Sequence, residues 1–120
     1  MKRILLKSVP DPRFAAASDP QYEVNRVDYR MLIEQALRIP FDRSAGASID
    51  EMRKAIRVLD SLEASDLVLV LEDADWEFLL RKVERMPWAV IDRRFVRFYD
   101  DVAGATESVS DPAQLDGVTS

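Results

Sequence analysis

The chain of 120 residues contains no cysteine and no histidine. The first absence excludes disulfides, thiolate zinc sites, iron–sulfur clusters and cysteine nucleophiles. The second removes the commonest general base and metal ligand, so no Ser-His-Asp triad can form within the chain. Glycine is scarce and isolated, which excludes the glycine-rich phosphate loops of nucleotide-binding proteins; the glycines are Gly46, Gly104 and Gly117. We therefore expect a protein that is not an enzyme, with no catalytic residues, no cofactor and no metal.

Positive charge is missing from the C-terminal part of the chain, since none of the 17 basic residues follows Arg97. The formal net charge is −5, and the negative excess falls in the last segment, at Asp100, Asp101, Glu107, Asp111 and Asp116. A neutral body with an acidic end does not suit a phosphate-binding surface, so nucleic acid is not the expected partner. Long apolar runs are absent too, and we expect no membrane span and no signal peptide.

The hydrophobic fraction of 48% is enough for a core, and the pattern predicts one compact α+β domain, mostly α, over residues 1–104. Apolar runs predict a strand over Lys2–Val9 and another over Leu67–Leu71, which should pair as a short two-stranded element. Residues 10–24 have the composition of a proline-rich arm or loop. Residues 105–120 have that of an acidic, disordered C-terminal tail.

Two helices are predicted before the central strand. The first should begin with Asn25 as its N-cap and stop before Pro40. The second has capping-box spacing at Ser48 and Glu51. Its apolar stripe, expected on one face of the helix, consists of Ile49, Met52, Ile56, Leu59 and Leu62.

Two further helices should form a C-terminal αα-hairpin. The third is expected to be capped by Asp73 or Asp75 and to end at Pro87. The fourth should run from Trp88 to Gly104, with Ile91 on its apolar face. Glu72 adds to the acids before the third helix; this cluster could be a hard-cation site, but acids that match a helix dipole are the favoured interpretation.

Arginines and aromatic residues alternate along the predicted hairpin, between Arg81 and Arg97. They could form a nucleic-acid surface, but nearby acids dilute the charge, which favours a solvated face or intersubunit ion pairs. Trp88 is open between a core anchor and an interface hot spot. The candidate protein-interaction residues are Trp88, Arg93, Arg94, Arg97, Asp100, Asp101, Asp111 and Asp116.

The segments IDEMRKAIRVLDSLE and LVLEDADWEFLLRKVERMPWAVIDRRFVRFYDDV, within residues 49–102, resemble small uncharacterised proteins encoded by tailed bacteriophages. The resemblance implies a viral origin and a location in the host cytoplasm or the virion, and it carries over no functional residue. We therefore expect a non-catalytic protein–protein interaction module, a phage assembly or virion structural component whose arm and tail contact other phage subunits or copies of itself in an oligomer.

Two alternative functions stay open. One is a phage-encoded inhibitor that binds a host protein through an acidic surface. The other is nucleic-acid binding through the Arg81–Arg97 hairpin.

Overall fold

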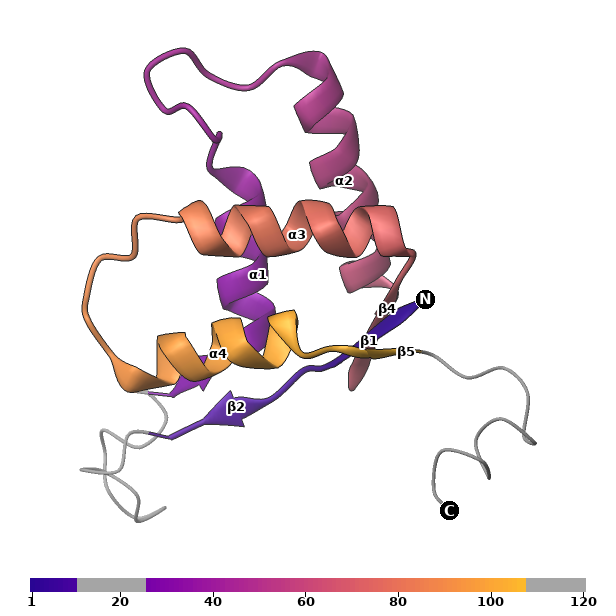
Figure 1. Cartoon of the computed structure of the whole chain (residues 1–120), viewed down its shortest axis with the longest axis vertical. Helices are drawn as coiled ribbons and strands as arrows, with labels where there is room; N and C mark the ends of the chain where they lie inside the picture. Colours follow the sequence, from indigo (N-terminus) through magenta and orange to yellow (C-terminus); the bar gives the residue numbers. More distant parts are fainter. Residues whose placement is uncertain (11–25, 108–120) are drawn as a thin grey trace.

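The computed structural model describes residues 1–10 and 26–107 of the chain (Figure 1). Within these residues the fold is α+β and mostly helical, with four helices, as predicted. The elements in chain order are β1 (Lys2–Leu5), β2 (Ser8–Val9), β3 (Val27–Asp28), α1 (Tyr29–Arg38), α2 (Ile49–Glu63), β4 (Val68–Leu71), α3 (Asp73–Arg85), α4 (Arg93–Ala103) and β5 (Thr106–Glu107). Apart from Pro10, the predicted arm lies outside the described residues, as do Asp111 and Asp116 in the tail.

The predicted pairing of the N-terminal and central strands is confirmed, with Ile4 opposite Leu69 in an antiparallel ladder. The sheet is larger than expected, because β5 adds a third strand on the other side of β1, in the order β4-β1-β5. This strand comes from the segment assigned to the tail. A second small sheet pairs β2 with β3.

The single strand expected over residues 2–9 is wrong, because the chain forms two short strands there. Leu6 still donates its N–H to the Leu67 carbonyl at 2.9 Å. The next carbonyl, of Lys7, instead accepts the N–H of Tyr29 at 2.9 Å. The chain therefore leaves the first sheet at this point and joins the entry of α1.

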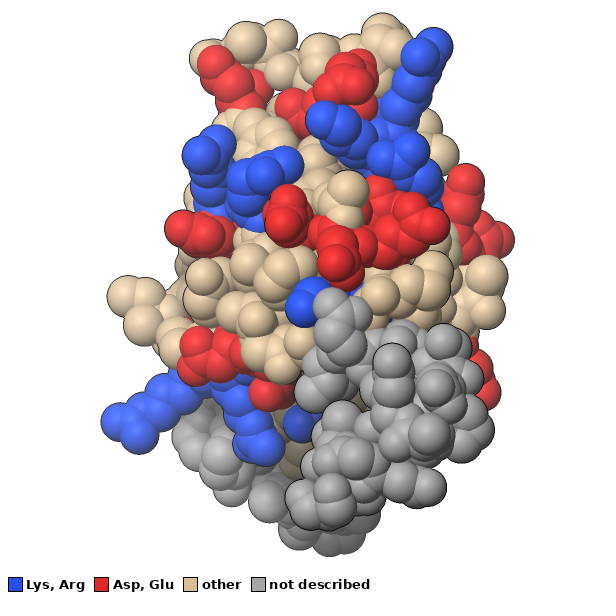
Figure 2. Space-filling view, turned by 45° about the vertical axis from the view of Figure 1, so that its right-hand side comes forward, with Lys and Arg blue, Asp and Glu red and all other residues tan. Residues whose placement is uncertain are grey.

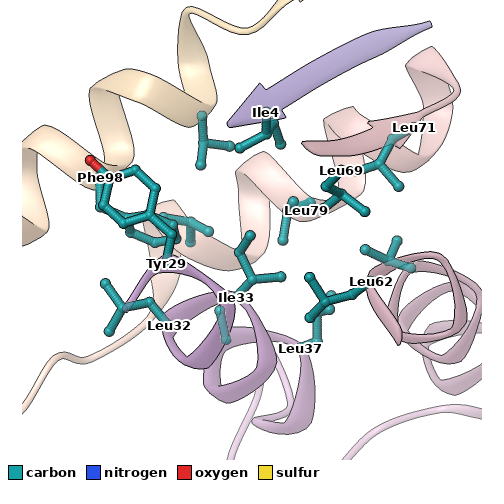
Figure 3. Close-up of a cluster of buried hydrophobic side chains, with 14 of the residues drawn as sticks. Ile4, Tyr29, Leu32, Ile33, Leu37, Leu62, Leu69, Leu71, Leu79 and Phe98 are labelled. Atoms are coloured by element: carbon teal, nitrogen blue, oxygen red, sulfur yellow. The ribbon is translucent and has the colours of Figure 1, made fainter. Parts of the chain in front are cut away.

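The helices pack across one another and the sheet closes one end of the core. In Figure 1, α3 crosses α1 and α2, and α4 runs beside α3 as the second arm of the predicted hairpin. Figure 3 shows Ile4 and Leu69 of the sheet meeting Ile33 of α1 and Leu79 of α3. All four side chains are buried, so one apolar cluster joins the sheet to the helices.

The starts of α1 and α3 differ from the prediction, as does that of α4, described below. Asp28 is the N-cap of α1 and accepts the N–H of Arg30 at 3.0 Å, whereas Asn25 lies outside the described residues. The cap position of α3 is Glu72, which makes no side-chain capping bond, so neither Asp73 nor Asp75 caps this helix. The ends before Pro40 and Pro87 are confirmed.

The start of α4 is the largest boundary error, because the helix begins at Arg93 and not at Trp88. Asp92 has extended backbone and accepts the N–H of Arg94 at 2.9 Å, which makes it the N-cap. Ile91 therefore lies in the loop before the helix. It is exposed instead of facing the core.

The apolar face predicted for α2 is only partly buried. Ala55, Val58 and Leu62 face the core, because α1 and α3 pack against that side of the helix. Of the predicted stripe, Leu62 is buried, whereas Ile49, Met52 and Ile56 are exposed. The 3.6-residue period identifies an apolar face of α2, but the neighbouring helices cover only one side of this face.

A buried ion pair joins α2 to α3 and to the loop after α1. Ser48 caps α2 by accepting the N–H of Glu51 at 3.1 Å, as the capping box predicts. The carboxylate of Glu51 accepts from Lys82 Nζ at 2.5 Å and from the Phe41 N–H at 3.1 Å. Lys82 is 3% exposed and also donates to the Ile39 carbonyl at 2.8 Å. These bonds satisfy the polar groups that α2, α3 and the loop bury together.

We predict that Lys82→Met lowers the free energy of unfolding by about 3 kcal/mol, because it leaves the Glu51 carboxylate buried without its cation. Urea denaturation measures the effect. The matched control is Lys54→Met, which removes an exposed pair to Asp50 and should cost only about 0.4 kcal/mol. Equal losses in the two variants would contradict the structural role of the buried pair.

Candidate protein-interaction site

The loop between α3 and α4 presents exposed aliphatic side chains beside a groove. Val90, Ile91 and Val96 have exposed fractions of 57%, 107% and 62%. They border a groove of about 620 Å³, called the hairpin groove below, which is lined by Val83, Glu84, Trp88, Val90, Ile91, Asp92, Arg93, Phe95, Val96 and Tyr99. The chemistry of this lining is mainly aliphatic and aromatic, which suits an apolar segment of a partner.

Packing of Trp88 holds the loop that forms the groove. The half-buried indole lies 5.3 Å from the Phe95 ring and 6.2 Å from the Phe98 ring, measured between centroids. Phe98 is fully buried, so Trp88 connects the loop to the core. Pro87 ends α3 and Asp92 caps α4, which leaves Val90 and Ile91 projecting from an anchored loop.

The three candidate arginines of α4 differ in their contacts. Arg93 is exposed, lines the groove and forms no ion pair in the described part of the chain. Arg97 is exposed too, but it is not part of the groove lining, and its charge acts on the Tyr29 hydroxyl. Arg94 binds the Asp92 carboxylate at 2.7 Å and lies 3.4 Å from the Val9 carbonyl. The structure therefore places only Arg93 in the lining of the groove.

Asp101 has a structural contact and lies away from the groove lining. It accepts the Tyr29 hydroxyl at 2.5 Å and lies 3.6 Å from Lys7 Nζ. Burial, followed by this hydrogen bond, raises the pKa of the Tyr29 hydroxyl well above its usual range. Asp100 is exposed on the same helix and has no contact with the groove. Of the two acidic candidates that the structure describes, Asp101 ties α4 to α1, and Asp100 is exposed and forms no ion pair with another described residue.

The acidic cluster before α3 is divided by its contacts. Asp75 is buried and accepts Arg57 Nε at 2.9 Å, whereas Glu72 and Asp73 are exposed. Over residues 1–10 and 26–107, no group of three or more acidic side chains is arranged to hold a metal ion. No helix among these residues is both long enough and apolar enough to span a membrane.

Sequence reasoning identified Trp88 and Arg93 at the site but missed the aliphatic residues around them. Ile91 fits the helical period of the buried stripe, and the sequence alone therefore predicts it on the apolar face of the helix. The signal that could have separated it is Asp92, a good N-cap residue placed directly before the arginine-rich segment. An N-cap there puts the preceding residues in the loop.

Comparison of the chain with protein-family models, with curated proteins and with solved structures found no match. The bacteriophage resemblance therefore stays a prediction, and the function is argued from the groove itself.

We predict that Tyr29 stays protonated in the folded protein at pH 11, where an ordinary tyrosine ionises. The native protein and Tyr29→Phe should therefore show equal increases in tyrosinate absorbance between pH 8 and 11. In urea, the unfolded wild-type chain should show a larger increase in tyrosinate absorbance than the unfolded Tyr29→Phe variant. If the native wild type gained one more tyrosinate than native Tyr29→Phe, that result would contradict the buried hydrogen bond to Asp101.

The same shift predicts the alkaline stability. The pKa of Tyr29 is raised in the folded state. The protonated Tyr29 hydroxyl therefore contributes to the free energy of unfolding below about pH 10, and this contribution is lost as the pH rises above that value. The free energy of unfolding should therefore fall more steeply above pH 10 for the wild type than for Tyr29→Phe.

Proposed function

We propose that the protein is a non-catalytic protein-binding module and that the hairpin groove is its binding surface. The exposure of Val90, Ile91 and Val96 around the anchored Trp88 carries this proposal. Binding surfaces concentrate their energy in apolar and aromatic side chains at the centre of a patch, with charged side chains at the rim. Arg93 and Glu84 provide such a rim here.

The energetics favour association at this surface. Covering a fully exposed aliphatic side chain contributes roughly 1.5–3 kcal/mol before the entropy lost on association is subtracted. Covering Ile91 and Val96 with a partner therefore offers a useful gross gain in binding free energy. The loop is already held by Trp88 and Phe95, so less conformational entropy is lost when a partner binds.

The contacts give less support to a nucleic-acid surface on the hairpin. Lys82 is buried with Glu51, and Arg94 is paired with Asp92. Arg85 lies over the Phe41 ring at 5.4 Å. Three of the cations that the sequence places together are thus engaged by other residues of the chain, whereas a phosphate-binding surface needs its cations gathered and free.

An acidic surface that mimics nucleic acid also receives little support. On the face shown in Figure 2, basic side chains lie directly above and below a band of acidic ones. Mixed charges of this kind do not produce the extended negative potential that such an inhibitor needs.

The wider role that we propose is a component of a bacteriophage assembly, made of other phage subunits or of copies of this chain. The sequence resemblance supports this role, and the groove supplies a surface for it. A location in the host cytoplasm or the virion would follow from the same proposal.

We predict that Ile91→Asp with Val96→Asp lowers partner capture at least about tenfold, because two carboxylates would be desolvated in the groove. Full-length tagged protein is incubated in a lysate of the cells in which it is naturally produced, and bound proteins are quantified by mass spectrometry. The matched control is Ile49→Asp with Ile56→Asp, which changes two exposed aliphatics on α2.

Proteins retained by the wild type and the control should fall at least about tenfold on the groove variant. Both variants change exposed side chains, so their free energies of unfolding should stay within about 0.5 kcal/mol of the wild type. Equal retention on a folded groove variant would contradict the proposed function.

A further inference from the structure

We propose that the exposed apolar face of α2 is a contact surface between two copies of this chain, packed helix to helix about a two-fold axis near Ile56. The inference goes beyond the proposed function, because no residue of α2 lines the hairpin groove. The uncovered apolar residues of α2 and the order of the charges beside them carry this proposal.

Within the described residues, one side of the apolar face of α2 is left uncovered. Ile49, Met52 and Ile56 are exposed by 64%, 45% and 53%, and Leu59 is half-buried. Their spacing of three, four and three residues places them in one row along the helix. A groove of about 310 Å³ lies beside Met52, Ile56 and Leu59. In Figure 1, α2 lies at one edge of the molecule, so a second helix can pack along this row.

The charges beside the row change sign along the helix. Arg53 and Asp60 are exposed, and neither forms an ion pair with another described residue. They are seven residues apart, which is close to two full turns, so both lie on the same side of the helix. The other basic residues of α2, Lys54 and Arg57, are paired within the chain. The edge of the row is therefore positive in its first half and negative in its second.

An antiparallel second copy matches this order of charges. When the two-fold axis passes near Ile56, residues at similar distances before and after it face each other across the contact. Arg53 precedes Ile56 by three residues and Asp60 follows it by four, so the arginine of each copy meets the aspartate of the other. Met52 and Leu59 stand in the same relation and form the apolar layers on either side of Ile56.

The same charges disfavour a parallel arrangement. It would bring together the two copies of Arg53 and likewise the two copies of Asp60, and like charges at this spacing are destabilising. Ile49 and Glu63 each lie seven residues from Ile56, at the ends of the contact. Crossed helices diverge there, so the exposed Glu63 carboxylate stays in water. The contact uses the same surface of both copies and closes at two of them.

The contact is small, with four apolar residues from each copy, and contacts of this size are weak and reversible. We expect a dissociation constant on the order of tens of micromolar. At about 1 µM the chain is then mostly monomeric. The capture and unfolding measurements described above, made at such a concentration, therefore concern the monomer, and the α2 variant stays a valid control for them.

The dimer leaves the hairpin groove of each copy open. In Figure 1, the loop between α3 and α4 lies on the opposite side of the molecule from α2. Two copies therefore present two binding surfaces, and a partner with two matching segments would bind the dimer more tightly than the monomer.

The first test is the mass of the full chain in solution, measured by sedimentation equilibrium between about 1 and 300 µM. The mass should rise from one copy to two copies and no further. Ile56→Asp, which places two carboxylates near the axis, should keep the chain monomeric. The matched control, Met31→Asp, changes a residue of α1 that is 57% exposed and should leave the dissociation constant within about twofold.

Three results of this first test would overturn the proposal. One is a wild-type chain that stays monomeric at the highest concentration. Another is assembly beyond two copies. The third is an equal effect of Ile56→Asp and Met31→Asp on the dissociation constant.

The second test reverses the charges beside the row and leaves the apolar residues unchanged. Arg53→Glu alone, or Asp60→Arg alone, should weaken dimerisation about tenfold at low salt, because each substitution creates two like-charge contacts. An equimolar mixture of these two variants should form a heterodimer of about wild-type affinity, because every contact between them joins opposite charges. The chain that carries both substitutions should dimerise like the wild type.

The matched control for the charge reversal is Arg81→Glu, which changes the net charge equally at an exposed arginine of α3. It should leave the dissociation constant within about twofold. All the substituted side chains are exposed, so circular dichroism should show the wild-type helix content in every variant. Unchanged dimerisation of both single variants, or a mixture that stays monomeric, would overturn the antiparallel contact.

Discussion

Burial of Tyr29 at the entry of α1 is the interaction on which the arrangement of the chain depends. Its N–H binds the Lys7 carbonyl, its ring lies 5.0 Å from Phe98, and its hydroxyl binds Asp101. One fully buried side chain thus joins the N-terminal strands, the first helix and the last helix. Loss of these contacts would remove the tie between α1 and α4, and α4 would then be held mainly by its packing on α3.

The hairpin groove depends on this arrangement through a chain of aromatic contacts. Tyr29 packs on Phe98, Phe98 on Trp88, and Trp88 on Phe95. The edge-to-face geometry of several of these pairs favours one relative orientation of the rings. Core packing therefore anchors the loop at Trp88, and the loop presents Ile91 to solvent beside this anchor. A surface that is ordered before binding is well suited to recognition.

Local signals predicted much of the fold because they act over a few residues. Ser48 caps α2, and Pro40 and Pro87 follow the ends of helices. The aliphatic run at Val68–Leu71 is a strand, of which Leu69 and Leu71 are buried and Val70 is exposed. Each of these depends on the backbone chemistry of its own neighbourhood. The candidate site was found in part for the same reason, since Trp88 follows a proline that had to end a helix.

The features that the sequence did not predict depend on contacts between distant residues. Glu51 has the spacing of a capping box, yet its carboxylate turns to Lys82, thirty-one positions away. The aliphatic residues of α2 and Ile91 fit a helical period, and only the neighbouring helices decide which of them are covered. Periodicity reports that a face is apolar, and it does not report whether another element lies on it. For this chain the uncovered apolar residues are the ones that carry the functional argument.

The position of β1 at the centre of its sheet has a consequence for folding. Both neighbours of this strand lie far along the chain, since Lys2 is opposite Leu71 of β4 and Glu107 of β5. The helices contact one another over shorter stretches of chain, so less chain entropy is lost when those contacts form. Pairing of β1 with β5 joins the most distant residues of the described fold, and we expect this side of the sheet to form late.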